Sequence, residues 1–174
     1  MLDVVQPDIV ALQEIHPIYR EAVQAAMENY PYQFYSPRGD KKHTIGIASR
    51  FPILQTSLLD NPPVNRGMSV LVDVDGETVQ VLVAHLTPNL IKHQSWPQYI
   101  RETEAWFDRR DQEMSVLLQE IRDRHHPTLI LCDCNMTRTS KTYRDLSQVA
   151  TDGFLQAGWG IGWTAFHPAV PYPV

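Results

Sequence analysis

The sequence predicts an α/β protein in which helices and strands form layers, with at least one mixed sheet. Apolar runs of strand length recur along the chain, helical segments lie between them, and no internal repeat or low-complexity tract interrupts the pattern. Strands that alternate with helices favour packed layers over a helical bundle. With 174 residues and a formal net charge of -5, the chain has the length and composition of one ordinary globular domain.

The first half of the chain is predicted to hold strands, one helix and a hairpin. The run "PDIVALQE" is apolar until Glu14. Pro17 then opens the helical stretch "PIYREAVQAAMENY", because proline suits the first turn of a helix. "TIGIASR" is typical of a strand that Pro52 ends. In "MSVLVDVDGETVQVLVAHL", two alternating runs flank Asp75 and Gly76, which is a strong signal for a hairpin turn.

The second half is predicted to hold a long helix, a buried strand and a short helix. The long helix runs from about Tyr99 to Arg124. Its apolar residues recur at helical spacing: Met114, Leu117, Leu118 and Ile121. The strand "TLILCDCN" and a short helix near "KTYRDLSQVA" follow, before a tail rich in glycine and tryptophan.

Three of the predicted strands end in polar side chains. Glu14 ends the first, His85 ends the second, and Asp133 with Asn135 ends the third. Residues two apart in a strand share a face, so Asp133 and Asn135 should lie on one face of the sheet. Because α/β sheets usually build their sites where strand ends converge, we predict that these side chains form a functional site.

The chemistry of these side chains suits a divalent cation and a phosphate ester. Carboxylate and amide oxygens favour Mg²⁺ or Mn²⁺ over softer metals, and the cation would compensate carboxylates that are costly to bury. A nearby His85 would donate a hydrogen bond or a proton. Each residue also has an ordinary structural explanation: a salt bridge for Glu14, a hydrogen-bonded core histidine for His85, and an Asx-turn for Asp133 and Asn135.

The chain has two cysteines, Cys132 and Cys134, on either side of Asp133. We expect two buried reduced thiols, because a bridge along one face of a strand would distort it. A Cys-x-Cys metal clip is not supported, since no second pair of cysteine or histidine residues stands at ligand spacing.

These segments, taken in order, resemble the endonuclease/exonuclease/phosphatase superfamily, whose members include deoxyribonuclease I. "PDIVALQE" is similar to its first metal motif, "GIASRFPI" to the strand and turn that follow, and "VLVAHL" to the strand that bears its phosphate-contacting histidine. "RRDQEMSVLLQEI" resembles the family helix with an Arg-x-x-Gln pattern, matched here to Arg109 and Gln112. "LILCDCNMTRTSKTYRDL" is similar to the Gly-Asp-Phe-Asn motif and to the Ser-x-x-Tyr that follows it, here Ser140 and Tyr143.

The resemblance implies a four-layer α/β/β/α sandwich of two mixed sheets with flanking helices, in which residues 1–174 form one partial domain. It also implies Mg²⁺- or Mn²⁺-dependent hydrolysis of phosphoester bonds by water attack at phosphorus. Glu14 would bind the metal and His85 would hydrogen-bond a phosphoryl oxygen. Asp133 would orient the attacking water or assist the leaving group, and Asn135 would hold the phosphate. Nucleic acid, phospholipid and small phosphoesters all stay open as substrates.

The family pattern also contains segments that this chain lacks. The family begins with a strand that bears an asparagine and ends with an Asp-bearing strand and a Ser-Asp-His motif, whereas the last aspartate here is Asp152. We therefore expect a piece of a longer enzyme, with its first strand and last strands missing, that is poorly stable and nearly inactive alone. The alternative is a catalytically inactive interaction or scaffold domain on the same fold. A serine hydrolase built on His85 is disfavoured, because no Gly-x-Ser-x-Gly elbow is present.

Composition limits the partners and the compartment. No apolar run approaches the roughly 20 residues of a transmembrane helix, and the N-terminus does not have the pattern of a signal peptide. We expect a soluble, monomeric domain, and any membrane or signal segment of a parent protein would lie upstream of Met1. The acidic balance argues weakly against sequence-independent binding of nucleic acid.

Overall fold

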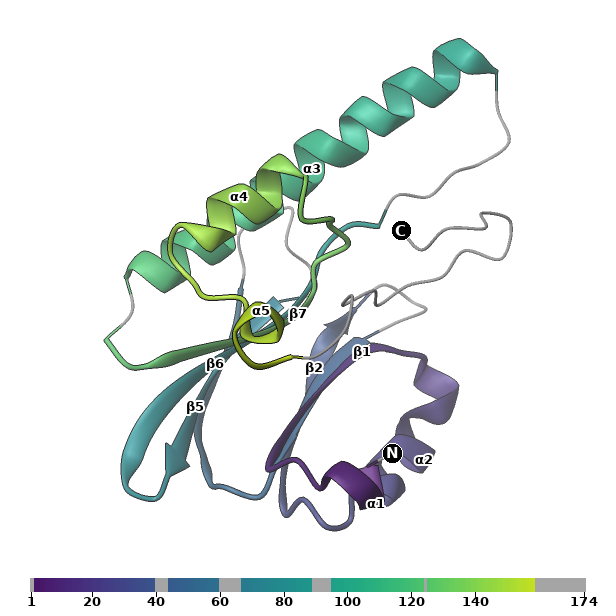
Figure 1. Ribbon diagram of the computed structural model, residues 1–174. Helices are drawn as coiled ribbons and strands as arrows, with labels where there is room; N and C mark the ends of the chain where they lie inside the picture. The colour runs from purple at the N-terminus through teal and green to yellow at the C-terminus, as the bar shows by residue number, and fades with distance from the viewer. Residues whose placement is uncertain (1, 40–43, 60–66, 89–94, 124, 159–174) are drawn as a thin grey trace. The chain divides into compact units, whose positions relative to one another are not determined.

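The computed structural model describes residues 2–39, 44–59, 67–88, 95–123 and 125–158 (Figure 1). The chain divides into two compact units, residues 1–135 and residues 136–174. The first unit contains both sheets and the second contains two short helices. Within the described residues, no helix combines the length and the apolar character that crossing a membrane requires.

The first sheet has the strand order β1-β3-β2, with antiparallel pairing throughout. Its strands and the helical segments near them are α1 (Leu2–Val5), β1 (Ile9–Ile15), the 3-10 helix η1 (Pro17–Tyr19), α2 (Arg20–Ala26), β2 (Tyr32–Gly39) and β3 (Thr44–Ser49). The helical stretch predicted from Pro17 is therefore confirmed. Met27 and Tyr30, which follow α2, pack against Ala48 of β3 and hold the α2 segment on one face of this sheet.

The second sheet has the order β4-β5-β6-β7 and is mixed. Its strands are β4 (Ile53–Leu58), β5 (Gly67–Val74), β6 (Glu77–His85) and β7 (Thr128–Asp133). The predicted hairpin is confirmed between β5 and β6: Asp75 and Gly76 have φ angles of 54° and 91°, and Gly76 N donates to Asp73 Oδ1 at 2.7 Å. Strand β7 pairs with β6 in parallel, which places Asp133 opposite His85.

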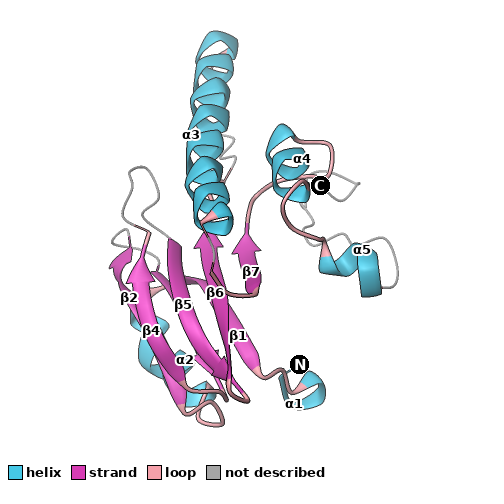
Figure 2. Cartoon of the chain, turned by 90° about the vertical axis from the view of Figure 1, so that its left-hand side faces the viewer, coloured by secondary structure: helices cyan, strands magenta, loops and turns pink. Residues whose placement is uncertain are grey.

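The two sheets pack face to face over an apolar core in the first unit (Figure 2). The fully buried side chains of this core are Ile45, Ile47, Met68, Val70, Val72, Val81 and Val83. Burial of each such side chain contributes about 1.5–3 kcal/mol relative to exposure, so this layer supplies much of the stabilisation of the sheets. Figure 1 shows helix α3 (Trp96–Arg122) against the second sheet and α2 against the first. The predicted α/β/β/α order is thus confirmed within this unit.

The second unit contains α4 (Lys141–Ser147) and α5 (Gly153–Ala157). Ser140 caps α4 by accepting a hydrogen bond from the backbone N–H of Tyr143 at 3.1 Å. The hydroxyl of Tyr143 donates to Asp152 Oδ2 at 2.8 Å, and Asp152 in turn caps α5. This hydrogen bond lowers the pKa of Asp152 and raises that of Tyr143. The Ser-x-x-Tyr pair therefore organises the local structure of this unit.

Candidate functional site

Three of the predicted site residues meet at strand ends of the first unit. His85 is the last residue of β6 and Asp133 is the last residue of β7. His85 Nε2 lies 3.8 Å from Asp133 Oδ2 and 3.8 Å from Glu14 Oε1 of β1. The site therefore joins one residue of the first sheet to two residues of the second.

The imidazole and the two carboxylates differ sharply in exposure. The side chain of His85 is 1% exposed, whereas those of Glu14 and Asp133 are 56% and 52% exposed. These separations of 3.8 Å are ion-pair distances, beyond the usual hydrogen-bond range. The site thus presents two carboxylates to solvent above a buried ring.

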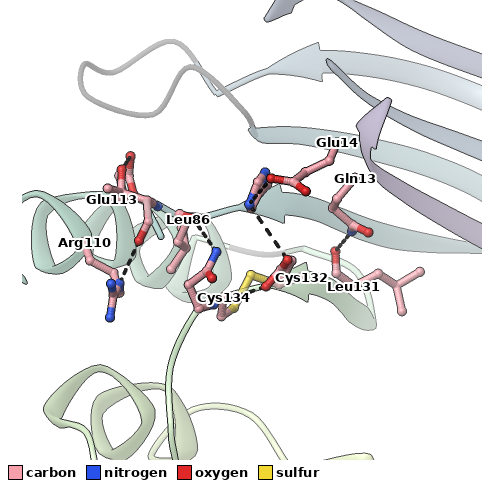
Figure 3. A network of polar contacts seen from close by, with 12 residues as sticks. Gln13, Glu14, Leu86, Arg110, Glu113, Leu131, Cys132 and Cys134 are labelled. Carbon is pink, nitrogen blue, oxygen red and sulfur yellow. Dashed lines mark hydrogen bonds and ion pairs between the residues drawn. A yellow bond between two sulfur atoms is a disulfide. The ribbon is translucent and has the colours of Figure 1, made fainter. Parts of the chain in front are cut away.

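The backbone of Glu14 turns its side chain toward the second sheet. Val10 and Leu12 pack on the α2 side of β1, and simple alternation would place Glu14 there as well. The register shifts between Leu12 and Ile15, and Glu14 takes a left-handed φ of 55°. Such a bulge re-aims side chains, and Figure 3 shows Gln13 and Glu14 side by side.

Gln13 makes the second link between the sheets at this point. Its Nε2 donates to the carbonyl oxygen of Leu131 in β7 at 3.3 Å (Figure 3). A left-handed conformation at a residue other than glycine costs about 1–2 kcal/mol, and it persists when the surrounding contacts hold it. The contacts that Gln13 and Glu14 make with the second sheet can hold this conformation.

Asn135 closes the end of β7 and ties it to β6. Its backbone N–H donates to Asp133 Oδ1 at 3.3 Å, which is an Asx-type turn, and its φ is 46°. Asparagine tolerates this region better than most residues. Its Nδ2 donates to the carbonyl oxygen of Leu86 at 2.9 Å, so the amide is anchored next to His85.

Cys132 and Cys134 form a disulfide, so the prediction of two reduced thiols is wrong. That prediction assumed a regular strand, in which Cα atoms two residues apart are separated by about 6.6 Å. Strand β7 ends at Asp133, and the chain turns at Asn135. The two Cα atoms are consequently 5.2 Å apart, within the range that a disulfide spans. The bridge brackets Asp133.

Thiol labelling will test this disulfide. We expect iodoacetamide to modify neither cysteine of the unfolded but unreduced chain, because both sulfur atoms are bonded to each other. After reduction with dithiothreitol, both should be modified. Mass spectrometry of the intact chain measures the difference, and Cys134→Ser, which leaves one free thiol, provides the control. Two modified cysteines without reductant would contradict the structure.

Helix α3 brings two buried charged residues to this region that the sequence analysis did not select. Arg110 is 2% exposed and Glu113 is 3% exposed. Both contact Thr87, two residues after His85: Glu113 accepts hydrogen bonds from Thr87 N and Oγ1 at 2.6 and 2.8 Å. Arg110 Nε donates to the Thr87 carbonyl oxygen at 3.0 Å.

The residues of this helix that match the family's Arg-x-x-Gln pattern are Arg109 and Gln112. Each lies one position before a buried charged residue. Gln112 is exposed, and the side chain of Arg109 is 50% exposed. Arg109 reaches the network through one ion pair, 3.6 Å from Glu113 Oε1. The buried pair with the same spacing is Arg110 and Glu113.

The donor set fits a hard divalent cation in its chemistry. Among the described residues, no group of three or more histidine, cysteine, aspartate or glutamate side chains is arranged to hold a metal ion. Mg²⁺, however, is commonly held by one or two carboxylates and completes its shell with water and substrate oxygens. The solvent-open carboxylates of Glu14 and Asp133 meet that requirement.

The sequence profile of the Endonuclease/Exonuclease/phosphatase family matches residues 1–173. The chain belongs to this family. No curated protein matches the sequence. The family assignment therefore rests on a match over nearly the whole chain.

This chain spans only part of the length of the solved structures that share its fold. TDP2 from D. rerio, complexed with a single-strand DNA product, has a TM-score of 0.59 and 20% identity over 85% of this chain and 54% of that one. Truncated TDP2 from Caenorhabditis elegans has a TM-score of 0.61 and 18% identity over 90% and 60%. Beta toxin from Staphylococcus aureus has a TM-score of 0.59 and 14% identity over 84% and 60%. These similarities confirm the deoxyribonuclease I-like fold.

Proposed function

We propose that this chain carries the metal- and phosphate-binding site of a phosphoester hydrolase. The observation that supports the proposal most directly is the approach of Glu14 and Asp133 to the same nitrogen of His85, at 3.8 Å each. Membership of the Endonuclease/Exonuclease/phosphatase family supports the reaction class. The DNA-product complex of TDP2 makes single-stranded DNA one substrate to test beside phospholipid and small phosphoesters.

Glu14 is the residue that would hold Mg²⁺ or Mn²⁺. Of the three convergent side chains, Glu14 is the one that comes from the first sheet. Its side chain is 56% exposed, so a cation and a substrate can approach it from solvent. When bound, the cation supplies positive charge against the phosphoryl oxygens. Its positive charge would also offset the repulsion between the two carboxylates at this end of the sheets.

The remaining residues act on the substrate and on water. Asp133 would orient the attacking water through its half-exposed carboxylate and assist the proton transfer that accompanies attack. His85 would donate a hydrogen bond to a phosphoryl oxygen, and its burial holds the ring in place before substrate arrives. Asn135, whose amide is fixed by Leu86, would hold the phosphate.

Hydrolysis of bis-p-nitrophenyl phosphate tests the proposal. We expect release of p-nitrophenol with Mg²⁺ or Mn²⁺ and not with EDTA from a chain extended at both ends from its source DNA, and little release from the 174-residue chain alone. Glu14→Gln and Asp133→Asn should each lower kcat/KM by about 100-fold, as expected for a lost metal ligand or proton-transfer group. Glu77→Gln is the matched control, because Glu77 is an exposed carboxylate at the opposite end of the strand that ends in His85.

Metal binding supplies a second measurement that does not require turnover. Titration calorimetry with Mn²⁺ should show binding to the wild-type chain and to Glu77→Gln, and weaker binding to Glu14→Gln. Binding without hydrolysis of the ester, of single-stranded DNA or of phospholipid would contradict the proposed reaction. Absence of both binding and hydrolysis would favour the scaffold alternative.

A further inference from the structure

The two residues that follow His85 have every backbone polar group engaged. Leu86 N donates to Asp133 O at 2.9 Å, and Leu86 O accepts from Asn135 Nδ2 at 2.9 Å. Thr87 N donates to Glu113 Oε2 at 2.6 Å, and Thr87 O accepts from Arg110 Nε at 3.0 Å. The end of strand β7 and Asn135 thus hold Leu86, and helix α3 holds Thr87.

Two buried charged side chains, Arg110 and Glu113, thus bind the backbone of one residue, Thr87. Arg110 and Glu113 are one helical turn apart on α3, and both are nearly inaccessible to solvent. Burial lowers the pKa of the Arg110 guanidinium, and the charge of Glu113 raises it. Buried charged groups often stabilise a fold no better than apolar residues of the same volume, so stability alone is a weak reason for placing two of them here.

The geometry of the contacts points to a positional role. Glu113 receives both the N–H and the hydroxyl of Thr87, which fixes the direction of the backbone as well as its distance from α3. The Nε–H of Arg110 fixes the carbonyl group of the same residue, Thr87. Since His85 lies two residues before Thr87, these hydrogen bonds restrain the backbone that carries its ring.

We infer that Arg110 and Glu113 are positioning residues for His85, acting through the backbone and hydroxyl of Thr87. This inference rests on the proposed function of His85. The pair sets the place of the imidazole relative to the two carboxylates through its contacts with Thr87. A displacement of about 1 Å at such a group can cost about 100-fold in rate.

Single conservative variants and one double variant test the inference. Arg110→Lys keeps the charge but changes the fork of donors, and Glu113→Gln keeps the shape but removes the charge. Arg122→Lys is the matched control, because it is the same substitution at an exposed position in the last turn of the same helix. The double variant Arg110→Met/Glu113→Leu removes both buried charges together, which avoids leaving one of them unpaired. Circular dichroism identifies the variants that remain folded.

The readouts are kcat, KM and the NMR signals of the His85 ring at one pH. We expect Arg110→Lys, Glu113→Gln and the double variant to lower kcat about 10- to 100-fold, with KM changed less than about threefold. The signals of His85 should shift in these variants and stay in place in Arg122→Lys. Recovery of wild-type kcat in a folded double variant would show that the pair acts only on stability, and would overturn the inference.

The NMR measurement separates this inference from the proposed function. If the wild-type chain hydrolyses no ester, the proposed reaction fails, but the His85 signals still report whether the pair positions the ring. Unchanged His85 signals in folded Arg110→Lys and Glu113→Gln would overturn the inference whatever the activity.

Discussion

His85→Ala is expected to lower kcat for hydrolysis of a phosphodiester by about 100- to 1000-fold, the usual effect of removing one aligned hydrogen-bond donor from a transition state. The affinity for Mn²⁺ should change little, because the carboxylate of Glu14 is the proposed metal ligand. Steady-state kinetics and calorimetry on the same samples give both quantities. This result would separate the histidine from the metal ligands by function.

A second substitution at the same position distinguishes two roles of the ring. His85→Gln retains a side-chain donor but cannot transfer a proton in the same pH range. Partial recovery of kcat relative to His85→Ala would indicate a hydrogen bond to phosphate, whereas equal loss would indicate proton transfer. His125→Ala, at an exposed histidine just after α3, controls for loss of an imidazole elsewhere. A wild-type kcat in His85→Ala would remove this residue from the mechanism.

The meeting of the strand ends could be predicted because it follows from short-range patterns. Apolar runs end in polar residues at Glu14, His85 and Asp133, and parallel pairing of β6 with β7 brings the last two side by side. The direction of the Glu14 side chain could not be predicted, since alternation alone points it toward α2. A register shift held by contacts with the other sheet decides it, and such contacts leave no local signal in the sequence.

Two of the four edge strands among the described residues were not predicted. Strands β2 and β4 were missed, whereas β1 and β7, which also lie at sheet edges, were predicted. Pro37 lies inside β2, where it weakens the strand pattern, and an edge strand tolerates it because one row of its backbone groups has no partner strand. Strand β4 begins directly after Pro52, which the sequence analysis had taken only as the end of the preceding strand.

The buried pair on α3 did have a signal in the sequence. Arg110 and Glu113 belong to the helical stripe whose other members are apolar: Met114, Leu117, Leu118 and Ile121. Two charged residues on the buried face of an amphipathic helix need partners, and they indicate a polar network. Comparison with the family pattern had directed attention to Arg109 and Gln112, one position toward solvent.

Glu14→Gly should be more stable than Glu14→Ala by about 1 kcal/mol, although alanine is usually the better choice in folded segments. Both substitutions remove the carboxylate, but only glycine adopts the φ of 55° without steric conflict. Urea denaturation of the two variants without metal measures the difference. At Glu21, an exposed residue of α2, the order should be reversed, because glycine costs about 1 kcal/mol in a helix.

The same variants connect the backbone of Glu14 to its proposed role. Wild-type chain should gain about 2.7 kcal/mol of stability when free Mg²⁺ is one hundred times its dissociation constant, and neither Glu14 variant should gain as much at that concentration. A stable but metal-insensitive Glu14→Gly would show that the left-handed backbone is tolerated because it delivers a carboxylate to the site. Equal stability of the glycine and alanine variants would contradict the strained conformation, and an undiminished Mg²⁺ response would exclude Glu14 as the ligand.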